Sequence, residues 1–286
     1  MNEPIRIVFL GDSITEDGTF IAYLDAYLQQ QRPENRYTLI NLGVSSETAS
    51  GLSEPDHPFP RPCLHDRLAR ALQQSKPDWA VLGYGMNDGI YAPFSAERFV
   101  AYQQGMLEAI GRIHDYGAKA IVMTPPPFDH LSIEASALLS EGEKSYSYKT
   151  PYEHYNDVLR SYANWILTLD RKADVIVNLY DPLLRHTQQE RKKNGDYRSG
   201  DGIHPNSDGH WIIAQALLSG LFHLTLAENT DFILRLEASP FFQLIVKRHQ
   251  VLHDAWKEHV GHTEPHESQR FAAGNSFAQI QRTVTR

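Results

Sequence analysis

A short apolar run that stops abruptly in a Gly-Asp-Ser turn is the most constraining feature of this 286-residue sequence. Residues 5–10 are apolar apart from one arginine, and Gly11-Asp12-Ser13 follows them directly. Such a run predicts a buried strand that ends at this turn. A helical pattern begins near Phe20, so Ser13 is expected at a strand-to-helix crossing, where parallel α/β sheets bind their ligands. Taken alone, the turn is equally consistent with a tight connection that carries polar caps.

The rest of the chain repeats this alternation of strand-like and helical segments. Four more apolar runs have the length and composition of buried strands: residues 37–42, 79–84, 119–124 and 174–180. Apolar residues at helical spacing lie between or after these runs, at residues 64–72, 97–114, 155–169 and 211–221. Strands that alternate with helices predict an α/β fold in which a five-stranded parallel sheet is covered on both faces.

The turns that follow the strands form the candidate site. Right-handed crossovers place the C-terminal ends of all parallel strands on one edge of the sheet. Four turns rich in glycine, asparagine, aspartate or serine are expected on or near that edge: residues 11–15, 43–48, 85–89 and 201–205. We therefore expect segments that are far apart in the sequence to build one site there.

Three other segments are predicted to lack long regular structure. Residues 53–63 carry four prolines, which disfavour regular structure, and are expected to form a surface loop beside a pocket. Residues 128–150 have no clear period and are interpreted as an inserted loop or a short helix. A polar loop is expected to lead from the fifth strand to Asp201.

The C-terminal part gives fewer signals. After Pro240, apolar residues at helical spacing predict one amphipathic helix: Phe241, Leu244, Ile245, Leu252, Trp256 and Val260. Residues 261–286 have few large apolar side chains and are interpreted as a tail or as an arm packed on the core.

Composition narrows the class of partner. The formal net charge of −8 disfavours nucleic acid or an anionic membrane, because no basic surplus is present to neutralise phosphates. No apolar run approaches the roughly 20 residues that a membrane span needs. The single cysteine, Cys63, excludes an intrachain disulfide framework, and the N-terminus enters the first strand without room for a signal peptide. These observations predict a cytoplasmic protein that binds neither nucleic acid nor membranes.

The residue types in the four turns fit nucleophilic catalysis. A serine hydroxyl attacks when a neighbouring base takes its proton, and that base is usually a histidine oriented by a carboxylate. Asp201 and His204 are three residues apart, so one short turn can join the carboxylate to an imidazole that faces Ser13. Candidate donors for an oxyanion are the Ser13 N–H, an N–H of the 43–48 turn and the Asn87 amide.

Together these motifs resemble the GDSL, or SGNH, hydrolase family. Four blocks occur in the family's order over roughly residues 5–222: Gly11-Asp12-Ser13, the 41–48 turn, Gly85-x-Asn87-Asp88 and Asp201-x-x-His204-Pro205. The resemblance implies a flavodoxin-like three-layer α/β/α sandwich, esterase or acylhydrolase activity, and neither a metal nor another cofactor. We expect the hydrolase domain over residues 1–225, with a helical extension and tail at 226–286 packed on the same domain.

The resemblance also implies a role for each motif residue. Ser13 is the implied nucleophile, His204 the base, Asp201 the group that orients it, and Asn87 an oxyanion donor beside the Ser13 N–H. The second block departs from the family's Asn-x-x-x-x-Gly, because Ser46 stands where the donor glycine is expected. A backbone N–H survives this replacement, although a positive φ would strain Ser46. We expect Ser46 to be the donor and rank Gly43 second.

Simpler structural roles explain several neighbouring residues. Asp88 is expected to support its turn, and Asp12 to brace the turn before Ser13. His249 and His253 fit one helix face, but the other C-terminal histidines scatter, so a solvated face is favoured over a zinc site. Six aromatic residues fall in or near the edge loops, and half of them fit equally well as core: Tyr84, Tyr91, Phe94, Phe128, Tyr146 and Tyr148. Tyr84, Tyr91 and Phe128 are our candidate pocket residues.

The sequence therefore predicts a serine esterase that cleaves carboxylic esters through an acyl-enzyme intermediate. The first expected substrate is a small-acyl ester, such as an O-acetylated carbohydrate, and a homo-oligomer is left open. Three alternatives stay open: a lipid-like ester or thioester as substrate, acyl transfer to a sugar, and a carbohydrate-binding protein that has lost turnover. Other enzyme families fit less well, because residues 11–15 lack the Gly-x-Ser-x-Gly elbow and residues 83–88 lack the third glycine of a dinucleotide fingerprint.

Overall fold

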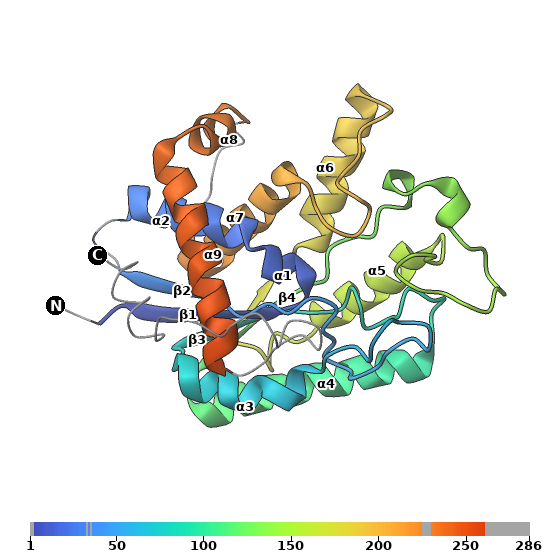
Figure 1. Cartoon of the computed structure of the whole chain (residues 1–286), viewed down its shortest axis with the longest axis horizontal. Helices are drawn as coiled ribbons and strands as arrows, with labels where there is room; N and C mark the ends of the chain where they lie inside the picture. The colour runs from blue at the N-terminus through green and yellow to red at the C-terminus, as the bar shows by residue number, and fades with distance from the viewer. Residues whose placement is uncertain (1–2, 33, 35, 225–229, 261–286) are drawn as a thin grey trace.

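Five parallel strands form the central sheet of the computed structural model, which describes residues 3–32, 34, 36–224 and 230–260 (Figure 1). The strands are β1 (Ile5–Gly11), β2 (Tyr37–Asn41), β3 (Trp79–Gly83), β4 (Lys119–Met123) and β5 (Val175–Val177). They are ordered β2-β1-β3-β4-β5, and each pairs in parallel with its neighbours. This is the flavodoxin-like order, whose switch point lies between β1 and β3. The predicted sheet is confirmed.

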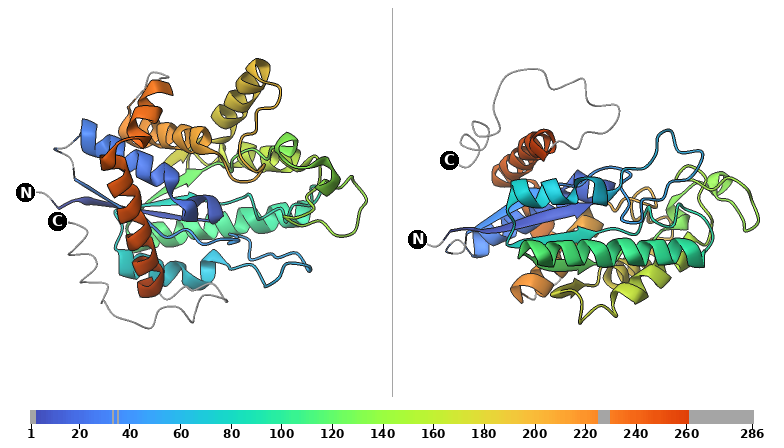
Figure 2. Two further views of the ribbon diagram at one scale, coloured as in Figure 1. Left: turned by 45° about the horizontal axis from the view of Figure 1, so that its top comes forward. Right: turned by 90° about the horizontal axis from the view of Figure 1, so that it is seen from below.

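Helices cover both faces of the sheet and make the fold a three-layer sandwich (Figure 2). One face carries α2 (Thr19–Gln31), α6 (Tyr180–Lys193) and α7 (Ser207–Phe222), and the other carries α3 (Leu64–Ser75), α4 (Ala96–Tyr116) and α5 (Tyr155–Ile166). Aromatic pairs join neighbouring helices, with Tyr23 edge-on to Trp211 on the first face and Tyr102 stacked on Tyr162 on the second. The apolar residues of β1 from Ile7 to Leu10 are fully buried between the two layers.

The expectation of a polar loop before Asp201 is wrong over most of its length, because Tyr180–Lys193 form helix α6. Only Tyr180, Leu183 and Thr187 bury their side chains on this helix, so its apolar stripe is too sparse to stand out in the sequence. Pro182 lies in the first turn, where its missing N–H costs no helical hydrogen bond. Residues 128–150, expected to be an inserted loop or a short helix, contain two 3₁₀ turns, η1 (His130–Ser132) and η2 (Ala135–Ala137).

Two further helices follow the sandwich. After α8 (Thr230–Glu237), α9 (Pro240–Val260) runs past the β2 edge of the sheet and contacts α2, β2 and α3 (Figure 1). The predicted amphipathic helix after Pro240 is confirmed, whereas the predicted tail, with His262 and His266, lies outside the described residues. Within the described ranges, no helix combines the length and hydropathy needed to cross a membrane.

Candidate active site

Ser13 lies just after the C-terminal end of β1, as the first residue of the short helix α1 (Ser13–Asp17). Asp12 caps this helix, because its Oδ1 accepts a hydrogen bond from the Ile14 N–H at 3.0 Å. The predicted bracing role of Asp12 is confirmed, and burial raises the pKa of its carboxyl to about 7. The Ser13 Oγ lies 2.8 Å from the Nε2 of His204, on a turn that is 191 positions further along the chain.

Asp201 holds His204 in two ways. Its Oδ2 lies 2.8 Å from the ring Nδ1, and its Oδ1 accepts from the N–H groups of Ile203 and His204 at 2.9 and 2.7 Å. Burial raises the pKa of Asp201, but these hydrogen bonds more than offset it and lower the pKa to about 2, so the carboxylate is charged. A neutral imidazole that donates its Nδ1–H to Asp201 presents the Nε2 lone pair to Ser13.

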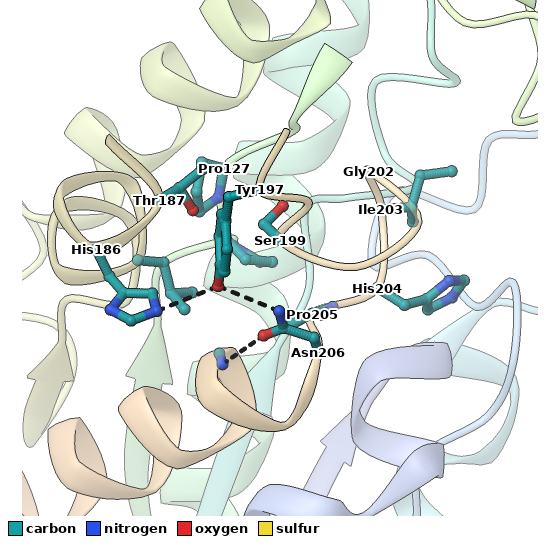
Figure 3. A pocket seen from close by; sticks show the side chains of 13 residues that line it. Pro127, His186, Thr187, Tyr197, Ser199, Gly202, Ile203, His204, Pro205 and Asn206 are labelled. Atoms are coloured by element: carbon teal, nitrogen blue, oxygen red, sulfur yellow. Dashed lines mark hydrogen bonds between the residues drawn. The ribbon is translucent and has the colours of Figure 1, made fainter. Parts of the chain in front are cut away.

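A pocket of about 20 Å³ lies behind the turn that carries this pair (Figure 3). In its wall, the Tyr197 hydroxyl accepts from Asn206 Nδ2 at 3.1 Å and lies 3.2 Å from His186 Nε2. Figure 3 shows the ring of His204 pointing away from this cluster. Gly200 closes the turn, since a Cβ there would come within 1.9 Å of the His204 carbonyl oxygen. The hydrogen-bonded residues that line this pocket therefore support the turn of Asp201 and His204 from behind.

Asp129 fastens the same turn from the loop that follows β4. Its Oδ2 accepts from Ser199 Oγ, Ser132 Oγ and Arg191 Nη2, each at 2.6 Å, and its N–H donates to the Gly202 carbonyl at 2.9 Å. Burial raises the pKa of Asp129, but the three donors outweigh burial and hold the pKa below its usual value. Asp129 could not be identified from the sequence, because two of its partners are 62 and 70 positions away and no motif marks it.

The turn after β2 leaves one backbone N–H available for an oxyanion. The N–H groups of residues 43, 44, 45, 47 and 48 donate, in that order, to Asn41 Oδ1, Gly11 O, Glu16 Oε2, Val44 O and Pro62 O. The Ser46 N–H has no acceptor among the residues that the structure describes. This is the position that counting from Asn41 selects.

Ser46 adopts the left-handed conformation that its place in the turn demands. Its φ is +65°, which costs a residue with a side chain roughly 1–2 kcal/mol. Its carbonyl accepts from Arg61 Nη1 at 3.2 Å, and Arg61 in turn forms a buried ion pair with Glu54, with Nε and Oε2 2.6 Å apart. The proline-rich loop is irregular as predicted, but its buried pair packs under the turn and helps to hold this conformation.

Gly43, our second-ranked donor, has another role. Its N–H already donates to Asn41 Oδ1 at 2.9 Å. A Cβ at this position would come within 2.2 Å of the Glu16 backbone nitrogen. Glycine is therefore required for the close approach of the turn to α1, and the geometry does not support Gly43 as an oxyanion donor.

Asn87 brings a side-chain amide to the same edge. Its Nδ2 donates to the Glu47 carbonyl at 3.1 Å, and its Oδ1 accepts from the Tyr91 hydroxyl at 2.9 Å. These two bonds fix the orientation of the amide, and no acceptor among the described residues takes the second N–H of Nδ2. Asp88 joins its turn to a segment 38 positions earlier in the chain, because its Oδ1 accepts from the Ser50 N–H at 2.8 Å.

A buried ionic network, for which the sequence gives no local signal, lies behind the oxyanion donors. The two carboxylate oxygens of Glu47 accept from Arg67 Nε and Nη2, both at 2.6 Å, and Oε2 also accepts from the Tyr84 hydroxyl at 2.6 Å. Such a bidentate pair is directional as well as strong. It holds Glu47, the neighbour of Ser46, in a fixed place.

The aromatic residues predicted to line a pocket are mostly core. Tyr84, Tyr91 and Phe128 are 1%, 2% and 2% exposed. Tyr84 and Tyr91 use their hydroxyls to hold Glu47 and Asn87, and Phe128 packs edge-on against Tyr155. These residues support the site from within and do not present open ring faces to a ligand.

The expectation of a solvated face for His249 and His253 is wrong, because both side chains are buried and make hydrogen bonds to protein groups. The Nε2 of His249 lies 2.7 Å from Asp25 Oδ2, and the Nδ1 of His253 lies 3.1 Å from the Asn41 carbonyl oxygen. Within the described part of the chain, no cluster of three or more His, Cys, Asp or Glu side chains is suited to hold a metal ion.

We expect the pH profile of ester hydrolysis to report the bond between Asp201 and His204. That hydrogen bond is the largest cause that raises the pKa of His204 above its ordinary 6.5. Protonated imidazole cannot accept the serine proton, so kcat/KM should fall on acidification with a midpoint above pH 6.5. A pH-stat assay of acid release measures the profile, with circular dichroism to verify that the fold persists across the range. A midpoint below 6.5 would contradict the pairing.

Comparison with known proteins agrees with these features. A model of the GDSL-like lipase/acylhydrolase family matches residues 9–212, well over half of the chain. The acetylxylan esterase of Geobacillus stearothermophilus is 23% identical over 236 residues, which are 74% of this chain and 92% of that protein.

Solved structures share the fold at lower identity. A variant of an acetyl xylan esterase from Geobacillus stearothermophilus has a TM-score of 0.52 and 20% identity, over 80% of this chain and 99% of that chain. A second acetyl xylan esterase, AlAXEase, has the same TM-score and identity over 75% and 98%. A gut microbial diltiazem-metabolizing enzyme has a TM-score of 0.57 and 18% identity over 77% of this chain, but this chain spans only 47% of that larger protein.

Proposed function

This chain belongs to the GDSL-like lipase/acylhydrolase family, and on that premise we propose that it removes acetyl groups from carbohydrates with Ser13 as nucleophile. The reaction class, carboxylic ester hydrolysis, follows from membership of the family and from the acetylxylan esterase relative. The observation that carries the residue assignment is the chain of two hydrogen bonds from Ser13 through His204 to Asp201, each 2.8 Å long. That arrangement activates a serine hydroxyl.

Acylation begins with proton transfer from Ser13 to His204. As Oγ bonds to the ester carbonyl carbon, Nε2 takes the hydroxyl proton, and the carbonyl electron pair moves onto oxygen to give a tetrahedral oxyanion. The charged Asp201 carboxylate stabilises the imidazolium that results. When the bond to the alcohol oxygen breaks, the imidazolium gives its proton to the departing alcohol, and an acetyl ester of Ser13 remains.

Three N–H groups are available for the oxyanion: those of the Ser13 and Ser46 backbones and the second N–H of the Asn87 amide. Each belongs to a residue that other hydrogen bonds hold in place, so the donors need no reorganisation when negative charge develops. Deacylation repeats the steps with water. His204 takes a proton from the water, the oxyanion forms again, and acetate leaves as Ser13 recovers its proton.

Acetylated carbohydrates are the proposed substrate class on two grounds. The 23% identical relative is an acetylxylan esterase, and the alignment covers 92% of it. The net charge of −8 disfavours polyanionic ligands, so neutral acetylated sugars are better candidates than acidic ones.

The test compares p-nitrophenyl acetate with p-nitrophenyl octanoate and measures acetate release from acetylated xylo-oligosaccharides, with Ser13→Ala as the blank. We expect kcat/KM for the acetate ester to exceed that for the octanoate ester by about 10-fold or more, together with serine-dependent acetate release from the sugars. A preference for octanoate would replace this proposal with a lipid-like ester. No serine-dependent release from any of them would favour a binding protein on a hydrolase fold. Product analysis with an added alcohol would detect acyl transfer.

A further inference from the structure

Glu16 links the nucleophile helix to the turn that carries the oxyanion donor. It lies on α1, three residues after Ser13, and its Oε2 accepts from the Ser45 N–H at 2.9 Å and from the Ser45 hydroxyl. Ser45 directly precedes Ser46 in the chain. The orientation of the peptide group that carries the donor N–H is therefore coupled to the position of the Glu16 carboxylate.

The other carboxylate oxygen of Glu16 is held from the C-terminal helix. The Nζ of Lys257, on α9, donates to Glu16 Oε1 at 2.6 Å. Lys257 is buried, and it stands 45 residues beyond the end of the family match at residue 212. Figures 1 and 2 show α9 beside α2 and reaching along the β2 edge of the sheet to the level of α3. A helix outside the matched segment thus contributes a charge beside the site.

The Glu16 carboxylate is charged in this environment. Burial raises its pKa, but the neighbouring His253 imidazole and the hydrogen bonds from Lys257 and Ser45 outweigh burial and lower the pKa to about 2. The Nε2 of His253 lies 3.7 Å from Oε1, on the same side as Lys257. A charged carboxylate is a strong acceptor for the Ser45 N–H, because charge-assisted hydrogen bonds are about twice as strong as neutral ones.

The turn needs such support on both sides of the donor. Ser46 has a φ of +65°, which a residue with a side chain keeps only when its surroundings hold it there. Arg61 holds the Ser46 carbonyl, and Arg67 holds Glu47 on the C-terminal side. On the N-terminal side, the hydrogen bond from the Ser45 N–H to Glu16 holds the chain in place.

We propose that Lys257 is a positioning residue for the oxyanion donor Ser46 and that it acts through Glu16 and Ser45. The inference rests on the proposed function, because it assigns Ser46 the role of donor in ester hydrolysis. It makes α9 a part of the catalytic apparatus and not only a cover for the sheet edge.

The test compares two substitutions on α9 in the full chain. Lys257→Met removes the ammonium group that holds Glu16, whereas Arg248→Met removes a cation of the same helix that pairs with Asp25 on α2. For p-nitrophenyl acetate we expect Lys257→Met to lower kcat about 10- to 100-fold with KM within about twofold, because a small displacement of a donor has large effects on rate. Lys257→Arg should recover most of this loss, and Arg248→Met should keep the wild-type kcat.

Thermal unfolding of both variants provides the control for stability. If Lys257→Met and Arg248→Met lower Tm by the same amount and also have the same kcat, α9 only stabilises the fold and the proposal is overturned. A double-mutant cycle tests whether Lys257 acts through Glu16. In a Glu16→Gln background, Lys257→Met should lower kcat far less than in the wild type, because the Glu16 carboxylate that Lys257 holds is no longer charged. An undiminished effect would show that Lys257 acts by another route and would overturn the proposal.

Phosphonylation of Ser13 by a p-nitrophenyl phosphonate, followed by mass spectrometry, separates this proposal from the proposed function. The reaction requires the nucleophile and the oxyanion donors but no ester turnover. If the wild type cleaves no ester but is phosphonylated, the proposed function fails. The phosphonylation rates of the two α9 variants then still test the positioning role of Lys257. A slower rate in Lys257→Met than in Arg248→Met supports the positioning role, and equal rates overturn it. If neither reaction occurs, both proposals fail.

Discussion

Ser13→Ala should lower kcat for ester hydrolysis by roughly 10⁴- to 10⁶-fold and leave thermal unfolding nearly unchanged. The substitution removes the atom that forms the acyl-enzyme, so only the oxyanion donors and substrate binding remain to accelerate attack by water. The stability effect is small because the hydroxyl makes its bond to a histidine whose side chain is 44% exposed. Such a bond contributes about 1 kcal/mol or less.

Steady-state kinetics with p-nitrophenyl acetate and a melting curve measure both parts of this prediction. Ser161→Ala is the matched control. Ser161 lies on helix α5, and among the described residues its hydroxyl bonds only to its own helix, at the Asp157 carbonyl. This control should keep full activity. An Ser13→Ala variant with more than about a tenth of the wild-type kcat would show that another residue is the nucleophile.

Asn87→Ala should lower kcat by about 100- to 1000-fold and change KM little. Its amide donor acts when negative charge develops on the carbonyl oxygen, so its loss destabilises the transition state more than the bound ester. The variant should also be less stable, since the Glu47 carbonyl and the Tyr91 hydroxyl each lose a buried partner, at about 1–3 kcal/mol for each group left unsatisfied.

Tyr91→Phe separates these two effects. It removes only the hydrogen bond to the Asn87 Oδ1 and keeps the ring that stacks on Tyr155, with centroids 5.0 Å apart. We expect a kcat loss below about 10-fold, because the amide stays in place with one bond fewer. If Asn87→Ala raised KM and left kcat unchanged, Asn87 would be a substrate contact and not an oxyanion donor.

The sheet and the convergence of its turns could be predicted because both depend on local patterns. Each buried strand is a short apolar run, and parallel topology forces the ends of such runs to one edge. The bond between Ser13 and His204, across 191 positions, follows from that topology together with the residue types in the turns. The choice of Ser46 over Gly43 could be made by counting from Asn41, and the structure supports it through the hydrogen bonds of the neighbouring N–H groups.

The features that could not be predicted from the sequence have no local signal in it. Only three side chains of helix α6 are buried, so its sequence is mostly polar and shows no clear helical period of apolar residues. Asp129 and Lys257 hold the site through partners that are tens to hundreds of positions away, and each is an ordinary charged residue in its own segment. Tyr84 and Tyr91 can be buried because the fold supplies acceptors for their hydroxyls, in Glu47 and Asn87. Their positions near edge loops in the sequence do not reveal these acceptors.

The residue that carries the acyl group during turnover identifies the nucleophile. The wild-type enzyme, mixed with p-nitrophenyl acetate and quenched in acid within the first turnovers, is digested and mapped by mass spectrometry. We expect one added acetyl group on Ser13, absent when Ser13→Ala is treated in the same way. Turnover with the acetyl group on a different residue, or with Ser13 never acetylated, would contradict this expectation.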